Sequence, residues 1–130
     1  MFTAASVFSS FAVDDLSAAK EFYGTTLGIE TSDGPMGMLQ LKVSGDTTVM
    51  VYPKPDHQPA EFTILNLTVS DIDAAVDELT RAGVEFIHYD TDQLKTDPKG
   101  IARSNNPEQG PSIAWFTDPA GNIIAVMQTP

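Results

Sequence analysis

The chain contains no cysteine, and this absence excludes several kinds of chemistry. Disulfides, thiolate nucleophiles and zinc–thiolate sites all depend on cysteine side chains, so the protein uses none of them. The sequence also has no run of about 18 apolar residues and no basic segment leading into an apolar stretch at its start, which argues against a membrane span and a secretory signal. We therefore expect a soluble protein of the cytoplasm.

Basic side chains are scarce. Seven Lys and Arg residues stand against 18 Asp and Glu residues, for a formal net charge of −11. Such a charge repels phosphate groups, so the sequence predicts neither nucleic acid nor a membrane surface as a partner. A cationic ligand would be attracted, although surplus acidic residues are also typical of a well-solvated surface.

Recognisable catalytic motifs are missing as well. The sequence has no glycine-rich phosphate loop, and Ser10 does not stand in the Gly-x-Ser-x-Gly turn that exposes a nucleophilic serine. Only two histidines occur, His57 in a proline-rich stretch and His88 alone at the end of an apolar segment. Neither has an evident partner for acid–base or metal chemistry.

What the chain does have is an internal repeat. Val13-Asp14-Asp15-Leu16 recurs as Val69-Ser70-Asp71-Ile72, and each copy follows an apolar, strand-like stretch. Each copy also leads into apolar residues at helical spacing, and these runs end at Gly28 and Gly83. The repeat predicts two copies of one strand–helix–strands unit.

The hydrophobic periodicity predicts the remaining elements of an α+β fold. We expect one domain, residues 1–130, made of a first module (1–52), a connector (53–59) that holds three prolines, and a second module (60–130). The polar stretch 90–110 is either a lid over a site or an insertion without a role. The expected strands are residues 6–13, 29–31, 36–43, 47–52, 62–69, 84–89, 111–117 and 122–128.

The two modules and the closing segment Phe116-Thr117-Asp118-Pro119-Ala120-Gly121-Asn122 resemble the vicinal oxygen chelate superfamily. That superfamily includes glyoxalase I, extradiol dioxygenases, fosfomycin resistance proteins and bleomycin resistance proteins. The resemblance covers nearly the whole chain. It implies two βαβββ modules that form an eight-stranded, curved mixed sheet around a cavity with the helices outside, and a homodimer.

The resemblance also places four metal-ligand positions. In the metalloenzymes of the superfamily, His, Glu or Gln side chains at these positions hold one divalent ion that acts as a Lewis acid. Here the positions fall on Phe8, Met50, Ile64 and Ala125, none of which donates a nitrogen or oxygen ligand. A shift of one residue offers no better ligands, so we expect no metal and no cofactor.

The side chains that remain on the expected concave face describe a ligand pocket. Trp115 is central, because the position three residues before Asp118 faces the cavity in the relatives. An indole, a tyrosine, methionine and a few polar groups suit a flat, partly aromatic ligand, although the same side chains could simply fill a core. The predicted pocket residues are Phe8, Ser10, Met50, Tyr52, Ile64, Asn66, Trp115 and Ala125.

Several functions remain open at this point. We favour a metal-free binding protein of the glyoxalase/bleomycin-resistance type, which sequesters an aromatic or cationic compound and is not an enzyme. One alternative is a metal-independent lyase, isomerase or hydrolase that acts on a small oxygenated metabolite, with Tyr52, His88 or an acidic side chain as acid or base. Another is a glyoxalase- or dioxygenase-like metalloenzyme, if the four positions are wrongly assigned; an inactive regulatory subunit is a third.

Overall fold

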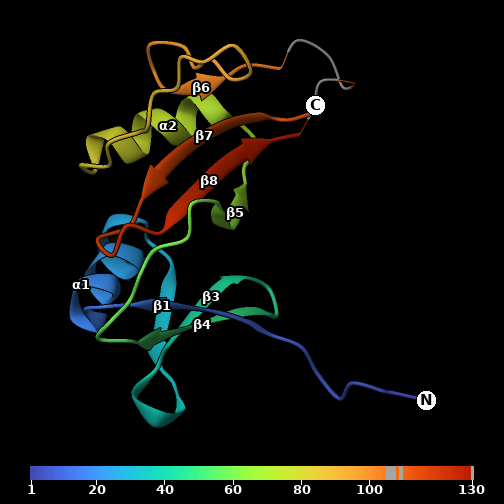
Figure 1. Ribbon diagram of the computed structural model, residues 1–130, viewed down its shortest axis with the longest axis vertical. Helices are drawn as coiled ribbons and strands as arrows, with labels where there is room; N and C mark the ends of the chain where they lie inside the picture. Colours follow the sequence, from blue (N-terminus) through green and yellow to red (C-terminus); the bar gives the residue numbers. More distant parts are fainter. Residues whose placement is uncertain (105–107, 109, 130) are drawn as a thin grey trace. The chain divides into compact units, whose positions relative to one another are not determined.

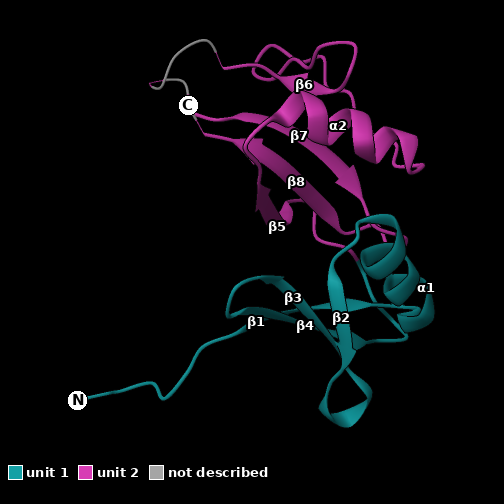
Figure 2. Cartoon of the chain, turned by 180° about the vertical axis from the view of Figure 1, so that it is seen from behind, with its two compact units in different colours: residues 1–58 teal, residues 59–130 magenta. Residues whose placement is uncertain are grey.

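The computed structural model describes residues 1–104, 108 and 110–129, and it divides into two units, residues 1–58 and 59–130 (Figures 1 and 2). Each unit contains one four-stranded mixed sheet and one main helical segment. No helix in the described part of the chain is both long and apolar enough to cross a membrane.

In unit 1 the sheet order is β1-β4-β3-β2, with β1 parallel to β4 and the other pairs antiparallel. The helical segment starts at Asp15, whose carboxylate accepts a hydrogen bond from the Ala18 backbone N–H (3.1 Å) and so caps the helix. The elements are β1 (Ser9–Val13), α1 (Leu16–Lys20), the π-helix η1 (Glu21–Thr26), β2 (Glu30–Asp33), the 3₁₀ turn η2 (Pro35–Gly37), β3 (Leu39–Ser44) and β4 (Thr47–Pro53).

Unit 2 repeats this plan. Its sheet order is β5-β8-β7-β6, again with a parallel first pair, and the Asp71 carboxylate caps the helix by accepting from the Ala74 N–H (3.1 Å). The predicted duplication of a βαβββ module is therefore confirmed. The elements are β5 (Thr63–Thr68), α2 (Ile72–Arg81), β6 (Ile101–Ala102), β7 (Ser112–Thr117) and β8 (Ile123–Gln128).

Two contacts identify which face of each sheet lies under its helix. In unit 1 the Phe11 ring packs against Tyr23 of η1, with ring centroids 5.7 Å apart. In unit 2 the Gln128 side chain accepts a hydrogen bond from the Ile72 N–H at the start of α2 (2.8 Å). Side chains alternate along a strand, so these contacts define a helix face and, opposite it, a distal face.

The helix faces carry the cores. In unit 1 the side chains of Leu41 and Val51 are completely buried there, and in unit 2 those of Phe116 and Ile124 are. Full burial of an aliphatic or aromatic side chain stabilises the fold by about 1.5–3 kcal/mol each. The distal faces are consequently not needed to hold each sheet to its helix.

Several predicted boundaries were wrong. The first strand begins at Ser9 rather than at residue 6, and residues 1–8 are exposed (Figure 1). The expected strand from residue 36 begins only at Leu39, because Pro35 starts a 3₁₀ turn in which Met36 has a φ of 60°. The helix expected to end at Gly28 widens into a π-helix at Glu21, where Leu27 N–H bonds the Phe22 carbonyl (2.9 Å).

The predicted strand at 84–89 is the main correction. Only Phe86 makes a β-bridge, to Phe116, and the Ile87 N–H donates to the Trp115 carbonyl (2.8 Å). The rest of the β7 edge pairs with β6, through Ile101 and Ala114. One edge is therefore shared by two short segments, and neither is long enough to run along all of it.

Residues 90–100, which belong to the predicted irregular loop 90–110, contain ordered local structure. Asp90 and Lys95 form a β-bridge, and the Asp97 carboxylate accepts from the backbone N–H groups of Lys99 and Ile101 (2.9 Å each). This local turn directs the chain into β6. Part of the predicted loop, residues 105–107 and 109, lies outside the described residues.

Candidate functional site

The distal face of each sheet carries one row of side chains across its three longest strands. In unit 1, Met50 of β4 lies between Ser10 of β1 and Gln40 of β3. In unit 2, Ala125 of β8 lies between Asn66 of β5 and Trp115 of β7. The two rows occupy equivalent positions in the repeat, so the predicted pocket residues Ser10, Met50, Asn66, Trp115 and Ala125 form two matched sets.

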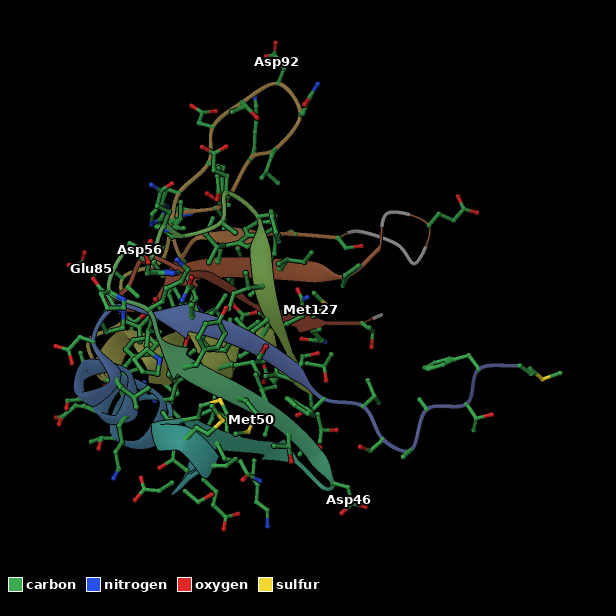
Figure 3. All side chains as sticks on the ribbon, turned by 60° about the horizontal axis from the view of Figure 1, so that its bottom comes forward. Asp46, Met50, Asp56, Glu85, Asp92 and Met127 are labelled. Atoms are coloured by element: carbon green, nitrogen blue, oxygen red, sulfur yellow. The ribbon has the colours of Figure 1, made fainter. Side chains whose placement is uncertain are left out.

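Chemically the two rows differ. In unit 1 the central side chain, Met50, is buried (Figure 3). Its terminal methyl group lies close to Gly34, and a Cβ added to Gly34 would be 2.7 Å from that methyl group. In unit 2 the central residue is Ala125, which has only a methyl group, flanked by a half-buried indole and an exposed amide. The unit 2 row thus has a small centre beside a large aromatic side chain.

The other predicted pocket residues lie outside these rows. Tyr52 pairs with Ala12 farther along the distal face of unit 1 and is 37% exposed. Phe8 precedes β1 and is 63% exposed. Ile64 lies at a register shift in the pairing of β5 with β8, so strand alternation does not assign its face. The pocket role of these residues stays a prediction.

A core-filling role fits some of these side chains and not others. Met50 and Ala125 are buried, as core residues are, whereas Ser10 and Asn66 are exposed polar residues. Trp115 is half-buried, so its exposure is intermediate between that of the buried residues and that of the exposed polar residues.

Sequence reasoning missed Tyr89. Its ring lies 5.4 Å from the Trp115 ring, centroid to centroid, at an interplanar angle of 84°. This edge-to-face arrangement is one that aromatic pairs prefer. The Ile87 N–H donates a hydrogen bond to the Trp115 carbonyl, and Tyr89 lies two residues later, on the same side of the segment. This alternation within residues 84–89 was the sequence signal that could have placed Tyr89 near Trp115.

Two surface hollows lie elsewhere. A hollow of about 510 Å³ in unit 2 is bordered by α2, by residues 84–88 and by Lys99, and it includes His88 and Glu85 at its rim. A second, of about 460 Å³, lies between the α1–η1 segment and β2 in unit 1. Neither of these two hollows is lined by a predicted pocket residue. His88, an acid–base candidate, therefore borders a different part of unit 2 from the Trp115 row.

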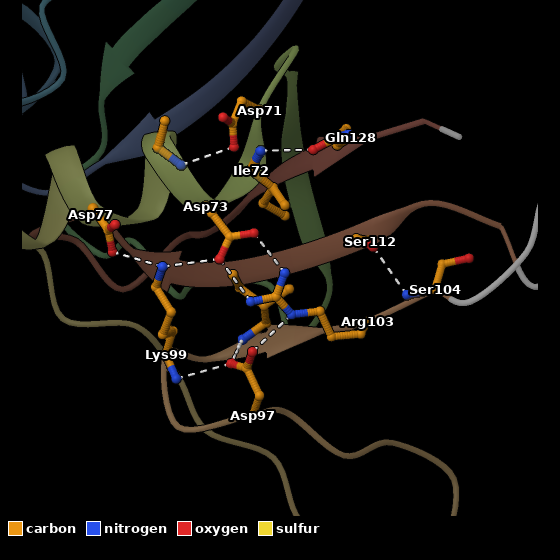
Figure 4. Close-up of polar contacts among 12 residues, drawn as sticks. Asp71, Ile72, Asp73, Asp77, Asp97, Lys99, Arg103, Ser104, Ser112 and Gln128 are labelled. Atoms are coloured by element: carbon orange, nitrogen blue, oxygen red, sulfur yellow. Dashed lines mark hydrogen bonds and ion pairs between the residues drawn. The ribbon is translucent and has the colours of Figure 1, made fainter.

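An ion-pair network joins α2 to the segment before β7 (Figure 4). Arg103 donates two hydrogen bonds to the Asp73 carboxylate (2.7 and 2.8 Å) and one to Asp97 (2.9 Å). Lys99 bridges Asp73 and Asp77 at 3.0 and 2.9 Å. We call these five residues the α2 network, and they hold the turn at residues 97–103 against the helix.

The α2 network shifts the titration of its own members. The hydrogen bonds from Arg103, and then those from Lys99, hold the pKa of Asp73 well below its usual range. Burial raises the pKa of Asp97, but hydrogen bonds from the Ile101 N–H and from Arg103 outweigh that effect and lower it. The Asp73 and Asp97 carboxylates therefore stay ionised at neutral pH and hold their cationic partners.

The turn after β7 is built by one buried carboxylate. Asp118 accepts hydrogen bonds from the Ala120 and Asn122 N–H groups (2.9 Å each) and from the Asn122 amide (3.0 Å). Asp118 is 4% exposed and Asn122 2%. All of these acceptor contacts are within the turn, so the Asp-Pro-x-Gly-Asn segment fixes the β7–β8 register and with it the alignment of Trp115 with Ala125.

The residues at the four superfamily metal positions do not fit a divalent ion. The side chains of Phe8, Met50, Ile64 and Ala125 carry no nitrogen or oxygen donor. Within residues 1–104, 108 and 110–129, moreover, no three His, Asp or Glu side chains lie close enough together to hold a metal ion. These four side chains therefore give no support for metal-dependent chemistry at these positions.

Comparisons with known proteins agree with the observed topology. The model of the family described as Glyoxalase/Bleomycin resistance protein/Dioxygenase superfamily matches residues 6–126. No curated protein sequence matches the chain.

Solved structures match over nearly the full length. TnmS3, an antibiotic binding protein from Streptomyces sp. CB03234, is 28% identical, with a TM-score of 0.69 over 99% of this chain and 100% of that one. A glyoxalase/bleomycin resistance protein/dioxygenase from Alicyclobacillus acidocaldarius is 18% identical, with a TM-score of 0.69 over 99% and 95% of the two chains. The fosfomycin resistance protein FosX from Listeria monocytogenes is 13% identical, with a TM-score of 0.70 over 100% and 96%.

Proposed function

Because the chain belongs to the Glyoxalase/Bleomycin resistance protein/Dioxygenase superfamily, we propose that it is a metal-free protein that binds and sequesters a small molecule. The proposed ligand is aromatic or cationic. It binds on the distal face of the unit 2 sheet, where the exposed Asn66 and the half-buried Trp115 supply the main contacts.

The observation that carries this proposal is the chemistry of the unit 2 row. Trp115 provides a partly exposed apolar surface beside the small, buried Ala125, and the exposed Asn66 amide can both donate and accept hydrogen bonds. Ligand sites commonly combine apolar walls with a few polar groups in this way. The same row carries no group that could act as a general acid or base at neutral pH.

Two further observations support the proposal. TnmS3, 28% identical over nearly the whole chain, is an antibiotic binding protein, so small-molecule binding occurs on this scaffold. The net charge of −11 raises the local concentration of cationic molecules around the protein.

The first test measures metal content. The purified protein is incubated with Zn²⁺, Ni²⁺, Mn²⁺ and Fe²⁺, the excess is removed, and bound metal is measured by elemental analysis. We expect no stoichiometric metal, because the four superfamily positions offer no donors. One metal per chain would show that the four positions are wrongly assigned and would favour metal-dependent catalysis.

The second test measures ligand binding by isothermal titration calorimetry with a panel of aromatic and cationic compounds. For a compound that saturates without turnover, Trp115→Ala should weaken binding by about 1–3 kcal/mol, which is roughly 5- to 150-fold in Kd. Phe2→Ala is the matched control, since Phe2 is 90% exposed in the segment before β1. An unchanged affinity in folded Trp115→Ala protein would remove this residue from the site.

We also propose a homodimer, as the superfamily resemblance implies, and a cytoplasmic location, which the lack of cysteine favours. Light scattering after size-exclusion chromatography tests the dimer: it should report twice the 14.0 kDa mass of one chain.

A further inference from the structure

Tyr89 and Trp115 present two aromatic rings at a right angle on unit 2. Their centroids are 5.4 Å apart, the interplanar angle is 84°, and both side chains are partly exposed. Beside Trp115 on the sheet lies the small Ala125. Ala125 is fully buried, so the corner is bounded by one ring on the sheet and one ring at its edge.

The backbone holds Tyr89 in place before any ligand arrives. The Ile87 N–H donates to the Trp115 carbonyl at 2.8 Å, which ties this segment to β7. The Tyr89 N–H donates to the Thr96 hydroxyl oxygen (2.9 Å), and the Thr96 N–H donates to the Tyr89 carbonyl (2.9 Å). These bonds close a small hairpin at Tyr89, so the backbone of this segment does not have to be ordered when a ligand binds.

The Tyr89 hydroxyl takes no part in this arrangement, since within the described part of the chain all the hydrogen bonds of Tyr89 are made by its backbone. What the side chain contributes at the corner is its ring.

We infer that Tyr89 is a second ligand-contacting residue of the Trp115 site, and that the site takes a planar, fused-ring aromatic cation. This inference rests on the proposed function and narrows it. A flat ligand can stack on one ring of the corner and meet the other edge-on, and both geometries are favourable. A positive charge on the ligand adds attraction to the ring faces and to the acidic protein.

The test is calorimetric titration with 9-aminoacridine, a planar three-ring cation, against a small set of variants. Tyr89→Ala and Tyr89→Leu should each raise Kd about 3- to 13-fold, because both remove the aromatic face. Tyr89→Phe should stay within about twofold of wild type, because it keeps the ring. Phe2→Ala serves again as the exposed-aromatic control. Circular dichroism confirms that each variant is folded, and Tyr89→Leu, which retains apolar bulk, covers the case in which Tyr89→Ala unfolds.

The outcomes separate this inference from the proposed function. If Trp115→Ala weakens binding and Tyr89→Leu binds like wild type, Tyr89 is not a contact, whereas the Trp115 site stands. If 9-aminoacridine does not saturate the wild type but naphthalene-2-sulfonate or uncharged naphthalene does, the inferred cation class is wrong. If none of the three binds saturably, the proposed aromatic-binding function fails as well.

Discussion

Gly100, which lies just before β6, approaches Phe86 closely, and this contact allows a quantitative test of how the chain before β6 is held in place. Gly100 has a φ of +92°, and a Cβ added there would lie 2.8 Å from the Phe86 Cβ. An L-residue in this conformation costs about 1–2 kcal/mol. Because a Cβ cannot rotate away, Gly100→Ala must also push Phe86 off the β7 edge, and overpacking of this kind typically adds about 1–3 kcal/mol. We expect a total loss of roughly 2–5 kcal/mol in the free energy of unfolding.

Gly83→Ala is the matched control. Gly83 has a similar φ of +100°, but an added Cβ would have no atom within 4 Å, so only the conformational penalty of about 1–2 kcal/mol should apply. Urea unfolding followed by far-UV circular dichroism measures both variants. Equal destabilisation by the two substitutions would refute the contact between Gly100 and Phe86. It would also weaken the view that the residue 86–89 segment is fixed against β7.

Three further predictions concern stability. Asp118→Ala should destabilise the protein by about 3 kcal/mol in urea unfolding, because buried N–H groups of the β7–β8 turn lose their acceptor. Phe116→Ala should destabilise it by about 3–5 kcal/mol, since the side chain is fully buried; a loss below 1 kcal/mol would contradict its place in the core. The pKa of Asp73 is lower in the folded protein than in the unfolded chain, so its stabilising effect is present above its ordinary pKa and is lost as the pH falls below about 4. Thermal melts from pH 7 to pH 2 should show this decline, and Arg103→Gln should reduce it.

The repeat and the two matched topologies could be predicted from the sequence because local signals agreed with each other. Asp15 and Asp71 cap their helices as their positions indicate, and strand periodicity placed Trp115 and Ala125 on one face.

Features that depend on tertiary contacts could not be predicted. The Val84–Tyr89 segment has strand-like residues, but β6 competes for the same edge of β7, and only the folded chain shows how the edge is divided. Likewise, Lys99 and Arg103 lie in a polar stretch without pattern, and both pair with Asp73, which lies far back in the sequence on α2. The ring contact between Tyr89 and Trp115 follows from this same pairing.

The two distal rows show that the copies of an internal duplication can diverge outside their cores. Each helix face keeps its buried core, whereas the equivalent central positions of the rows have diverged to Met50 in one module and Ala125 in the other. Substitutions on a distal face leave the helix-face core untouched, so the residues of that face can change without replacement of the core.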